Sequence, residues 1–225
     1  MRVEKVVCTQ CKNSGSVNTY QSINVSTNPE LKDKVKDGSL FVWKCPNCGR
    51  LNLCSYKTLY HDPESKLMIW FLPEEQLSKE ERQTIGQKID SLTGDTTLDN
   101  ELEGYTLRRV SDIGSLIEKV NIHDAGLNDV VIELCKYVTK LELAEKSKST
   151  AKASAIIETP FKFFRFTGAD NEIIFSFPED GSMKCINVGF NVYEDCLGIL
   201  QRNPEMASGK GFSEIDATWI SKFMR

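Results

Sequence analysis

The apolar positions at the start of the chain alternate with polar ones, which is typical of strands. Residues 16–25 predict one strand, whose inner side is formed by Val17, Thr19, Gln21, Ile23 and Val25. A short helix is expected next, because Asn28 is a suitable cap, Pro29 suits the first turn and Gly38 suits a left-handed end. Residues 40–44 and 50–56 are then expected to be extended.

Helical periodicity dominates the middle of the chain. A continuous apolar run predicts a strand over residues 67–72, and a second strand is expected over residues 105–110. Between them, Ser78 and Glu81 have capping-box spacing and predict a short helix, with apolar positions at Ile85, Ile89 and Leu92. Two helical stripes follow. The first contains Ile113, Leu116, Ile117 and Val120, and the second contains Leu127, Val130, Val131, Leu134, Val138 and Leu141.

The last third of the chain returns to strand patterns. Residues 144–155 contain few bulky apolar side chains and are interpreted as a frayed helix end or a linker. Three strands separated by turns are predicted after that segment, over residues 161–166, 172–177 and 182–188. Two short helices are expected to end the chain, over residues 193–202 and 217–223, with Asp216 as the cap of the second.

Composition and charge place the chain among ordinary globular proteins. Of its 225 residues, 40% are apolar and 27% are charged, and no apolar run is long enough to span a bilayer. The first eight residues lack the apolar stretch of a signal peptide, so we expect a cytoplasmic protein with no membrane partner. Residues 1–57 contain nine Lys/Arg against four Asp/Glu, which favours an anionic partner, although scattered surface lysines are common.

Four cysteines in two short pairs are the strongest chemical signal. Cys8 and Cys11 form one pair, and Cys45 and Cys48 form the other. Two such pairs are typical of a tetrahedral zinc site, in which four thiolates leave no open coordination position and the metal is structural. An iron site of rubredoxin type is the minor alternative, and two unrelated thiol pairs are another. Thioredoxin-like chemistry needs one such pair at a helix start in a βαβ unit, which neither pair has.

The other four cysteines stand alone among mostly apolar neighbours. We interpret Cys54, Cys135, Cys185 and Cys196 as small buried hydrophobic residues. The size of the chain, the metal spacing and the absence of a signal peptide favour a reducing compartment over a disulfide framework.

His61 and Asp62 are the remaining candidate functional pair. An imidazole oriented by the adjacent carboxylate would supply a general base or a metal ligand, although a hydrogen-bonded turn beside Pro63 has the same sequence. The chain has two histidines and lacks the phosphate-binding, dinucleotide-binding, nucleophile-elbow and zincin motifs. No residue is therefore assigned as catalytic.

Together these patterns predict an α+β protein. An N-terminal zinc ribbon with an inserted helix, over residues 5–60, is followed by a strand and helices over residues 66–145. Residues 146–155 are expected to link this first domain, residues 1–145, to a small C-terminal α+β domain over residues 156–225.

The same residues resemble bacterial CpXC proteins over residues 5–145. The resemblance rests on Cys8-x-x-Cys11, Asp37-Gly38, Leu40-Phe41, Cys45-Pro46-Asn47-Cys48-Gly49, Tyr60-His61-Asp62, Arg109-Val110, Glu118-Lys119-Val120, Asn128-Asp129 and Glu133. Thr9 stands where that family has a proline, which is not a metal ligand. The resemblance implies a zinc site at Cys8, Cys11, Cys45 and Cys48, and it implies no enzymatic activity.

These observations favour a non-enzymatic interaction protein with a structural zinc ribbon that supports a protein-binding surface. Nucleic-acid binding through the basic ribbon is the alternative hypothesis. A hydrolase that uses His61 and Asp62 is the third.

Overall fold

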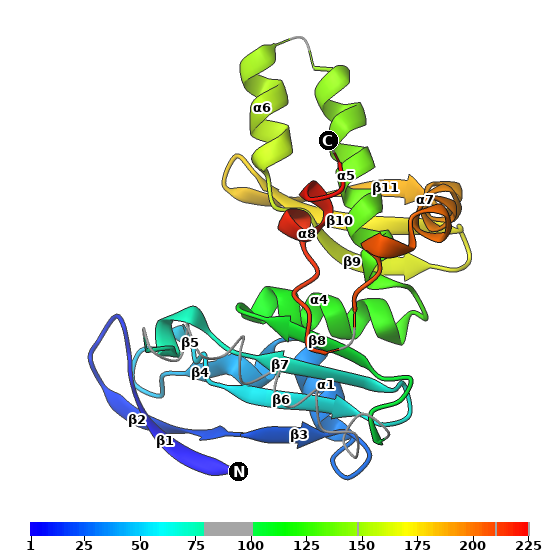
Figure 1. The fold of residues 1–225 in the computed structure, drawn as a ribbon. Coiled ribbons are helices and arrows are strands. Elements are labelled where there is room, and N and C mark those ends of the chain that lie inside the picture. Colours follow the sequence, from blue (N-terminus) through cyan, green and yellow to red (C-terminus); the bar gives the residue numbers. More distant parts are fainter. Residues whose placement is uncertain (79–100, 148, 210, 225) are drawn as a thin grey trace. The chain divides into compact units, whose positions relative to one another are not determined.

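The structure of this chain is a computed structural model that describes residues 1–78, 101–147, 149–209 and 211–224. The chain divides into two compact units, which Figure 1 shows coloured along the sequence. Unit 1 contains Met1–Ile117 and Lys210–Ser213, and unit 2 contains Glu118–Gly209 and Glu214–Arg225. The division falls inside helix α4, Ile113–Asp124, rather than in residues 146–155. The helix expected at Ser78 and beyond lies outside the described residues.

Two small antiparallel sheets form the ribbon of unit 1. Strand β1 (Arg2–Val7) pairs with β2 (Ser14–Thr19), and β4 (Val42–Lys44) pairs with β5 (Leu51–Leu53). The single strand expected over residues 16–25 is wrong. The chain leaves β2 after Thr19 and enters β3 in a different sheet, because β2 pairs with β1 whereas β3 pairs with β6.

Unit 1 also contains a four-stranded mixed sheet. Its order is β3-β6-β7-β8, with β3 over Ser22–Asn24, β6 over Thr58–Asp62, β7 over Leu67–Phe71 and β8 over Thr106–Val110. The β3–β6 and β7–β8 pairs are parallel, and β6–β7 is antiparallel. Alternate residues of the central strands β6 and β7 are buried. Strands β7 and β8 confirm the strands predicted over residues 67–72 and 105–110.

The inserted helix of unit 1 is α1, Glu30–Lys36, and its Leu31 and Val35 are buried as expected. Pro29, rather than Asn28, occupies the cap position. Gly38 has φ 76°, so it ends the helix in the left-handed region as predicted. Residues 39–41 then form the short helix η1, Ser39–Phe41, instead of the expected extended chain. A further turn, η2, covers Glu74–Gln76.

Unit 2 places helices against a three-stranded antiparallel sheet. The sheet order is β11-β10-β9, with β9 over Lys162–Thr167, β10 over Glu172–Glu179 and β11 over Ser182–Gly189. The helices are α5 (Asp129–Glu145), α6 (Thr150–Glu158), α7 (Phe190–Arg202) and α8 (Ala217–Ser221), with the turn η3 at Pro204–Met206. The C-terminal strands and helices confirm the sequence prediction. Helix α6 occupies most of the segment interpreted as a linker.

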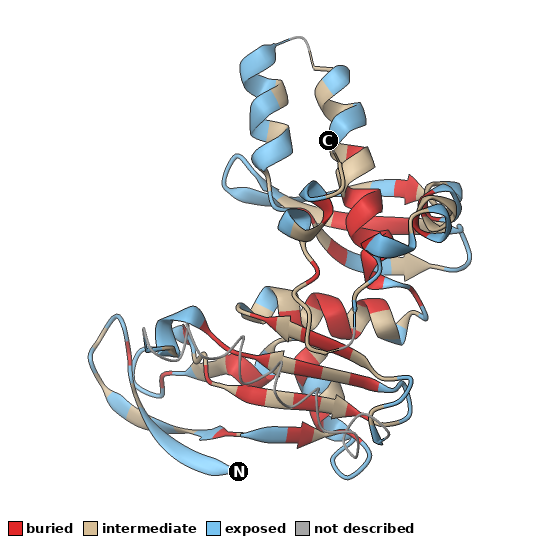
Figure 2. Ribbon diagram, viewed as in Figure 1, coloured by how far each residue is buried: buried red, intermediate tan, exposed pale blue. Residues whose placement is uncertain are grey.

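Burial in unit 2 is concentrated where α5 meets the sheet. Figure 2 shows the first half of α5 as buried, and the core of unit 2 includes Val131 and Leu134 of this helix together with Phe175 of β10. Two side-chain caps define the starts of α5 and α8. Asn128 accepts hydrogen bonds from the Val130 and Val131 amides, and Asp216 accepts one from the Trp219 amide at 2.8 Å.

Candidate metal centre

The first cysteine pair lies in a tight turn between β1 and β2, which we call the first knuckle (residues 8–13). The Cys8 amide donates to the Asn13 carbonyl at 2.9 Å, and the Lys12 amide donates to the Cys8 carbonyl at 3.1 Å. Lys12 has φ 60°, the left-handed region that lysine rarely adopts. This backbone places the Cys8 and Cys11 side chains on the same side of the turn.

The second cysteine pair repeats this geometry between β4 and β5, in the second knuckle (residues 45–50). The Cys45 amide donates to the Arg50 carbonyl at 2.8 Å, and the Gly49 amide donates to the Cys45 carbonyl at 2.9 Å. Gly49, with φ 72°, is the positional equivalent of Lys12. The sequence therefore builds two similar turns, each with a cysteine pair on one side.

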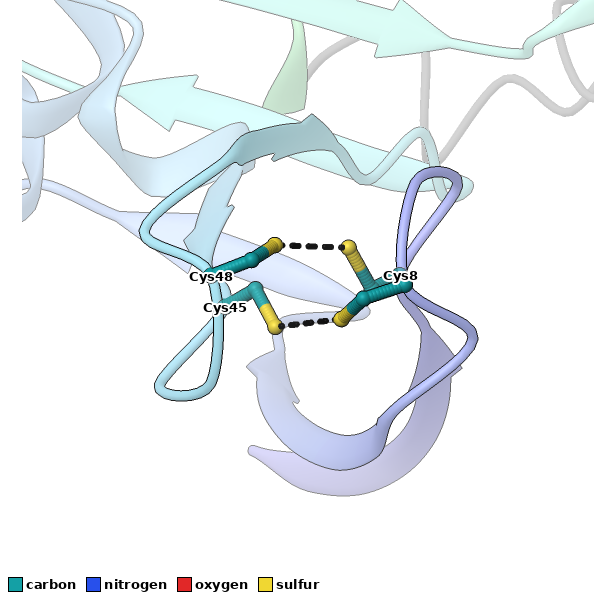
Figure 3. A group of neighbouring side chains, drawn as sticks. Cys8, Cys45 and Cys48 are labelled. Carbon is teal, nitrogen blue, oxygen red and sulfur yellow. Dashed lines mark hydrogen bonds between the residues drawn. The ribbon is translucent and has the colours of Figure 1, made fainter.

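The two knuckles face each other and bring four sulfurs together. All four Sγ atoms lie within 4.8 Å of one another. Cys8 Sγ is 3.6 Å from Cys48 Sγ, a contact between the knuckles that is drawn in Figure 3. Cys11 Sγ is 3.5 Å from Cys45 Sγ. Zn–S bonds of about 2.3 Å in a tetrahedron require sulfurs about 3.8 Å apart. The donor set and its spacing therefore fit a tetrahedral metal ion bound by four thiolates.

The sulfur cluster is asymmetric in exposure and in proton affinity. Cys8 and Cys45 are buried, whereas Cys11 is half-buried and Cys48 is exposed. Hydrogen bonds lower the pKa of Cys8 to about 6, and the bond from the Cys11 amide contributes most to this shift. The Arg50 amide lowers the pKa of Cys48, but desolvation and the three other thiols together raise it to about 12. A cation bound by these sulfurs would displace the proton that Cys48 retains.

Asn52 and Thr9 make polar contacts beside Cys8 that the sequence alone does not indicate. Asn52 lies on β5 and is buried, and its side-chain oxygen accepts from the Thr9 amide at 2.9 Å. Its side-chain nitrogen lies 3.8 Å from Cys8 Sγ. Thr9 and Asn52 are 43 residues apart, so no local spacing in the sequence indicates this contact.

The structure does not bring His61 and Asp62 together. They are consecutive residues of β6 and therefore point to opposite faces of the sheet. His61 Nε2 is 3.1 Å from the Tyr105 hydroxyl, whereas Asp62 Oδ2 is 3.0 Å from Lys32 Nζ. Burial acts to raise the pKa of Asp62, but the Ser65 amide and Lys32 hold it below its usual value. His61 and Asp62 therefore do not form the hydrogen-bonded carboxylate–imidazole pair that the hydrolase hypothesis invokes.

The cysteines outside the cluster differ from one another. Cys135 and Cys196 are buried in the core of unit 2, as expected, and Cys54 is half-buried. The expectation for Cys185 is wrong, because this thiol is exposed on β11, whose first four residues are all exposed.

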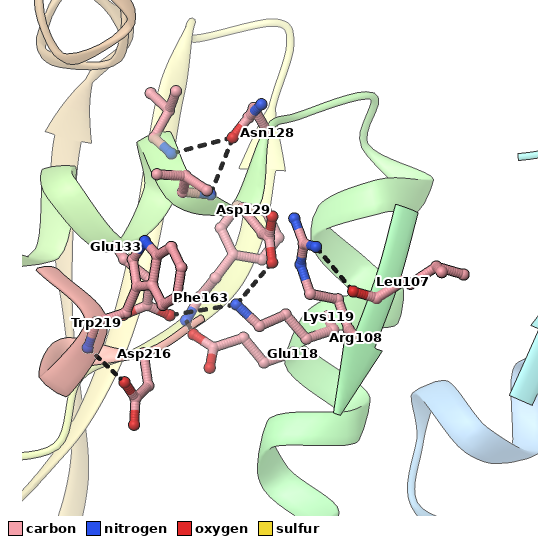
Figure 4. A network of polar contacts seen from close by, with 12 residues as sticks. Leu107, Arg108, Glu118, Lys119, Asn128, Asp129, Glu133, Phe163, Asp216 and Trp219 are labelled. Atoms are coloured by element: carbon pink, nitrogen blue, oxygen red, sulfur yellow. Dashed lines mark hydrogen bonds and ion pairs between the residues drawn. The ribbon is translucent and has the colours of Figure 1, made fainter. Parts of the chain in front are cut away.

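A network of buried charges in unit 2 is a second feature that sequence reasoning missed. Lys119 Nζ lies 2.9 Å from Asp129 Oδ2, and both side chains are almost completely buried. Figure 4 shows this ion pair. Lys119 is also 3.5 Å from Glu133, which in turn lies 2.7 Å from Lys136. The sign alternates between neighbours, so each buried charge has an opposite charge beside it. We interpret this network as structural.

Comparisons with known proteins give one match. The sequence model of the family described as CpXC protein matches residues 6–136, which is more than half of the chain. Neither the curated proteins nor the solved structures contain a match. Within the described ranges, no helix combines the length and apolar composition needed to cross a bilayer.

Proposed function

Because this chain belongs to the CpXC family, we propose that it is a non-enzymatic interaction protein whose four clustered cysteines bind a structural zinc ion. The observation that carries the proposal is the group of four Sγ atoms within 4.8 Å of one another. Four thiolates saturate a tetrahedral zinc ion and leave no position for water or substrate. The metal would therefore hold the ribbon together and expose no reactive site.

The metal proposal is tested by elemental analysis of the reduced protein. We expect close to one zinc ion per chain, and loss of the ion on Cys45→Ser substitution. Cys185→Ser is the matched control, because this exposed thiol lies in unit 2, outside the cluster. Iron in place of zinc, or no metal in the reduced wild-type protein, contradicts the proposal.

Exposed apolar side chains on both sheets of the ribbon are candidate contacts for a protein partner. Val3 and Val7 on β1 are 67% and 57% exposed, and Leu51 and Leu53 on β5 are 64% and 71% exposed. Leu51 and Leu53 lie opposite Lys44 and Val42 across the β4–β5 pair. Apolar side chains next to a lysine favour a partner segment that is apolar and acidic.

The partner proposal is tested by cross-linking in a lysate of the native host. We expect the double variant Leu51→Ser/Leu53→Ser to lose a protein that the wild type captures, and zinc removal to have the same effect. Met183→Ser is the control, because Met183 is 64% exposed but lies on β11 of unit 2. Equal capture by the wild type and the Leu51/Leu53 variant contradicts the use of this surface.

Nucleic-acid binding is a second candidate function, favoured by the charge of the ribbon. Lys5 lies between Val3 and Val7 on β1, and Lys44 lies opposite Leu51. If the ribbon binds nucleic acid, its affinity will fall steeply with salt, and Lys5→Ala or Lys44→Ala will each reduce the salt slope by roughly one. No binding at low salt eliminates this candidate.

A further inference from the structure

Asn52 uses its whole side-chain amide to connect the two knuckles. The Oδ1 atom accepts from the Thr9 amide at 2.9 Å and from the Thr9 hydroxyl at 3.0 Å. The Nδ2 atom donates to the Arg50 carbonyl at 3.1 Å and lies 3.8 Å from Cys8 Sγ. An asparagine amide has two acceptor and two donor positions, and all four are engaged here.

The orientation of this amide follows from its partners. A backbone N–H can only donate, so the Asn52 atom that faces the Thr9 amide must be the oxygen. The carbonyl of Arg50 can only accept, so the atom that faces it must be the nitrogen. The same nitrogen then directs its second N–H toward Cys8 Sγ. The polar contact to the sulfur is therefore built into the fold.

Thr9 completes a connection that does not depend on metal. Its hydroxyl accepts from Arg50 Nε at 3.1 Å while it donates to Asn52. Thr9 belongs to the first knuckle, and Arg50 ends the second. We call Thr9, Asn52 and Arg50 the knuckle latch. The equivalent of Thr9 in the second knuckle is Pro46, which has no N–H to donate, so the latch acts on one side only.

We propose that Asn52 is a positioning residue of the metal centre, which holds the first knuckle in place before metal binds and donates to the Cys8 thiolate afterwards. This inference rests on the proposed zinc binding. A preorganised site loses less conformational entropy on binding, and an N–H donor stabilises the negative charge of a bound thiolate. Partners outside the ligand shell typically change metal affinity by about 10–100-fold when they are mutated.

Three substitutions separate the parts of the latch. Asn52→Asp keeps an acceptor for Thr9 but replaces the donor near Cys8 with a carboxylate oxygen. Thr9→Val removes the hydroxyl and keeps the amide, whereas Thr9→Ser keeps both. Asn18→Asp is the matched control, because Asn18 is an exposed residue of β2 in the same ribbon.

The experiment is a zinc competition titration against a chromophoric chelator, with spectra of the Co²⁺-substituted proteins. We expect Asn52→Asp to weaken zinc binding by about 10–100-fold and to shift the thiolate-to-cobalt charge-transfer band. Thr9→Val should weaken binding less, and Thr9→Ser and Asn18→Asp should match the wild type. In the metal-free wild type the Thr9 amide should exchange slowly with solvent, and Asn52→Ala should accelerate its exchange.

The outcomes distinguish the inference from the function on which it rests. Wild-type protein that binds no metal overturns the proposed function itself. Wild-type affinity and an unchanged cobalt band in Asn52→Asp overturn the role of Asn52 alone. If Asn52→Asp fails to fold, the zinc affinities of Thr9→Val and Thr9→Ser test the latch instead. A loss in the valine variant that serine restores supports the latch, and equal affinities overturn it.

Discussion

Lys136 Nζ lies 3.0 Å from Glu118 Oε1 in the interior of unit 2, and the two side chains are only 8% and 3% exposed. Glu118 is on α4 and Lys136 is on α5, so the ion pair connects two helices. Glu118 also accepts from the Phe163 amide at 2.6 Å and lies 3.3 Å from Lys162 Nζ on β9. One carboxylate therefore joins two helices and a strand.

Substitution of Glu118 should destabilise unit 2. Glu118→Ala leaves Lys136 without one of its two carboxylate partners and the Phe163 amide without its acceptor. Loss of one partner in a buried ion pair costs about 3–5 kcal/mol. The measurement is the free energy of unfolding in urea. Glu142→Ala is the control, because its pair with Lys146 spans 3.6 Å on the surface and its loss should cost less than about 0.5 kcal/mol. Equal effects of the two variants would contradict the structural role of Glu118.

The stability of unit 2 should decrease in acid because of the same carboxylate. Burial opposes the charged form, but Lys136, Lys162, Lys119 and the Phe163 amide together lower the pKa of Glu118. A carboxyl whose pKa is lower in the folded state stabilises the fold above its unfolded pKa of about 4.3. This contribution is lost as the pH falls through the folded value.

The pH effect is measured as the difference in unfolding free energy between the wild type and Glu118→Gln from pH 7 to pH 3. We expect this difference to be constant near neutrality and to shrink below about pH 4. Trp219 fluorescence reports on unit 2 if Trp43 and Trp70 are replaced by phenylalanine in both proteins. A difference that is the same at every pH would exclude Glu118 as the titrating group.

Lys12 and Gly49 occupy equivalent left-handed positions in the two knuckles, and substitutions there should change stability in opposite directions. A side chain added at Gly49 should destabilise the protein, whereas glycine at position 12 should relieve strain. Gly49→Ala adds a Cβ that meets no atom within 4 Å, so its cost is the φ of 72° alone, about 1 kcal/mol. Lys12 already bears that strain, and Lys12→Gly should be more stable than Lys12→Ala, which keeps φ but lacks the amino group. The measurement is the thermal midpoint of the zinc-loaded proteins at one zinc concentration. Lys12→Gly no more stable than Lys12→Ala would show that Lys12 is unstrained.

Alkylation of the thiols should report metal binding residue by residue. In metal-free protein we expect Cys11 to react first within the cluster, because it is half-buried and its pKa is lowered. The hydrogen bond with the Asn47 side chain contributes most to this lowering. Zinc should protect Cys11. Exposed Cys185 should react equally with and without zinc, and buried Cys135 should stay unmodified. Peptide mass spectrometry gives the rates, and a zinc-independent rate at Cys11 would argue against metal binding there.

Local patterns allowed the sequence to predict most helices and strands. The Asp216 cap and the apolar stripe of α5 depend on neighbours three or four residues away, and both are present in the structure. The single strand predicted over residues 16–25 is wrong because its end depends on contacts with distant parts of the chain. Their alternation continues without a break, and only the choice of partner strands separates β2 from β3. Pairing partners come from distant parts of the chain, which a local pattern does not specify.

The sequence by itself identified the four cysteines of the candidate metal centre, because a C-x-x-C turn positions both of its sulfurs through backbone geometry within a few residues. It also determined that helices and strands are mixed in an α+β chain. Only the tertiary structure decided that Asn52 contacts Thr9 across 43 residues and that Lys136 contacts Glu118 across 18. These contacts form because folding buries polar groups that must then find partners, and the partner available at each place depends on the whole fold.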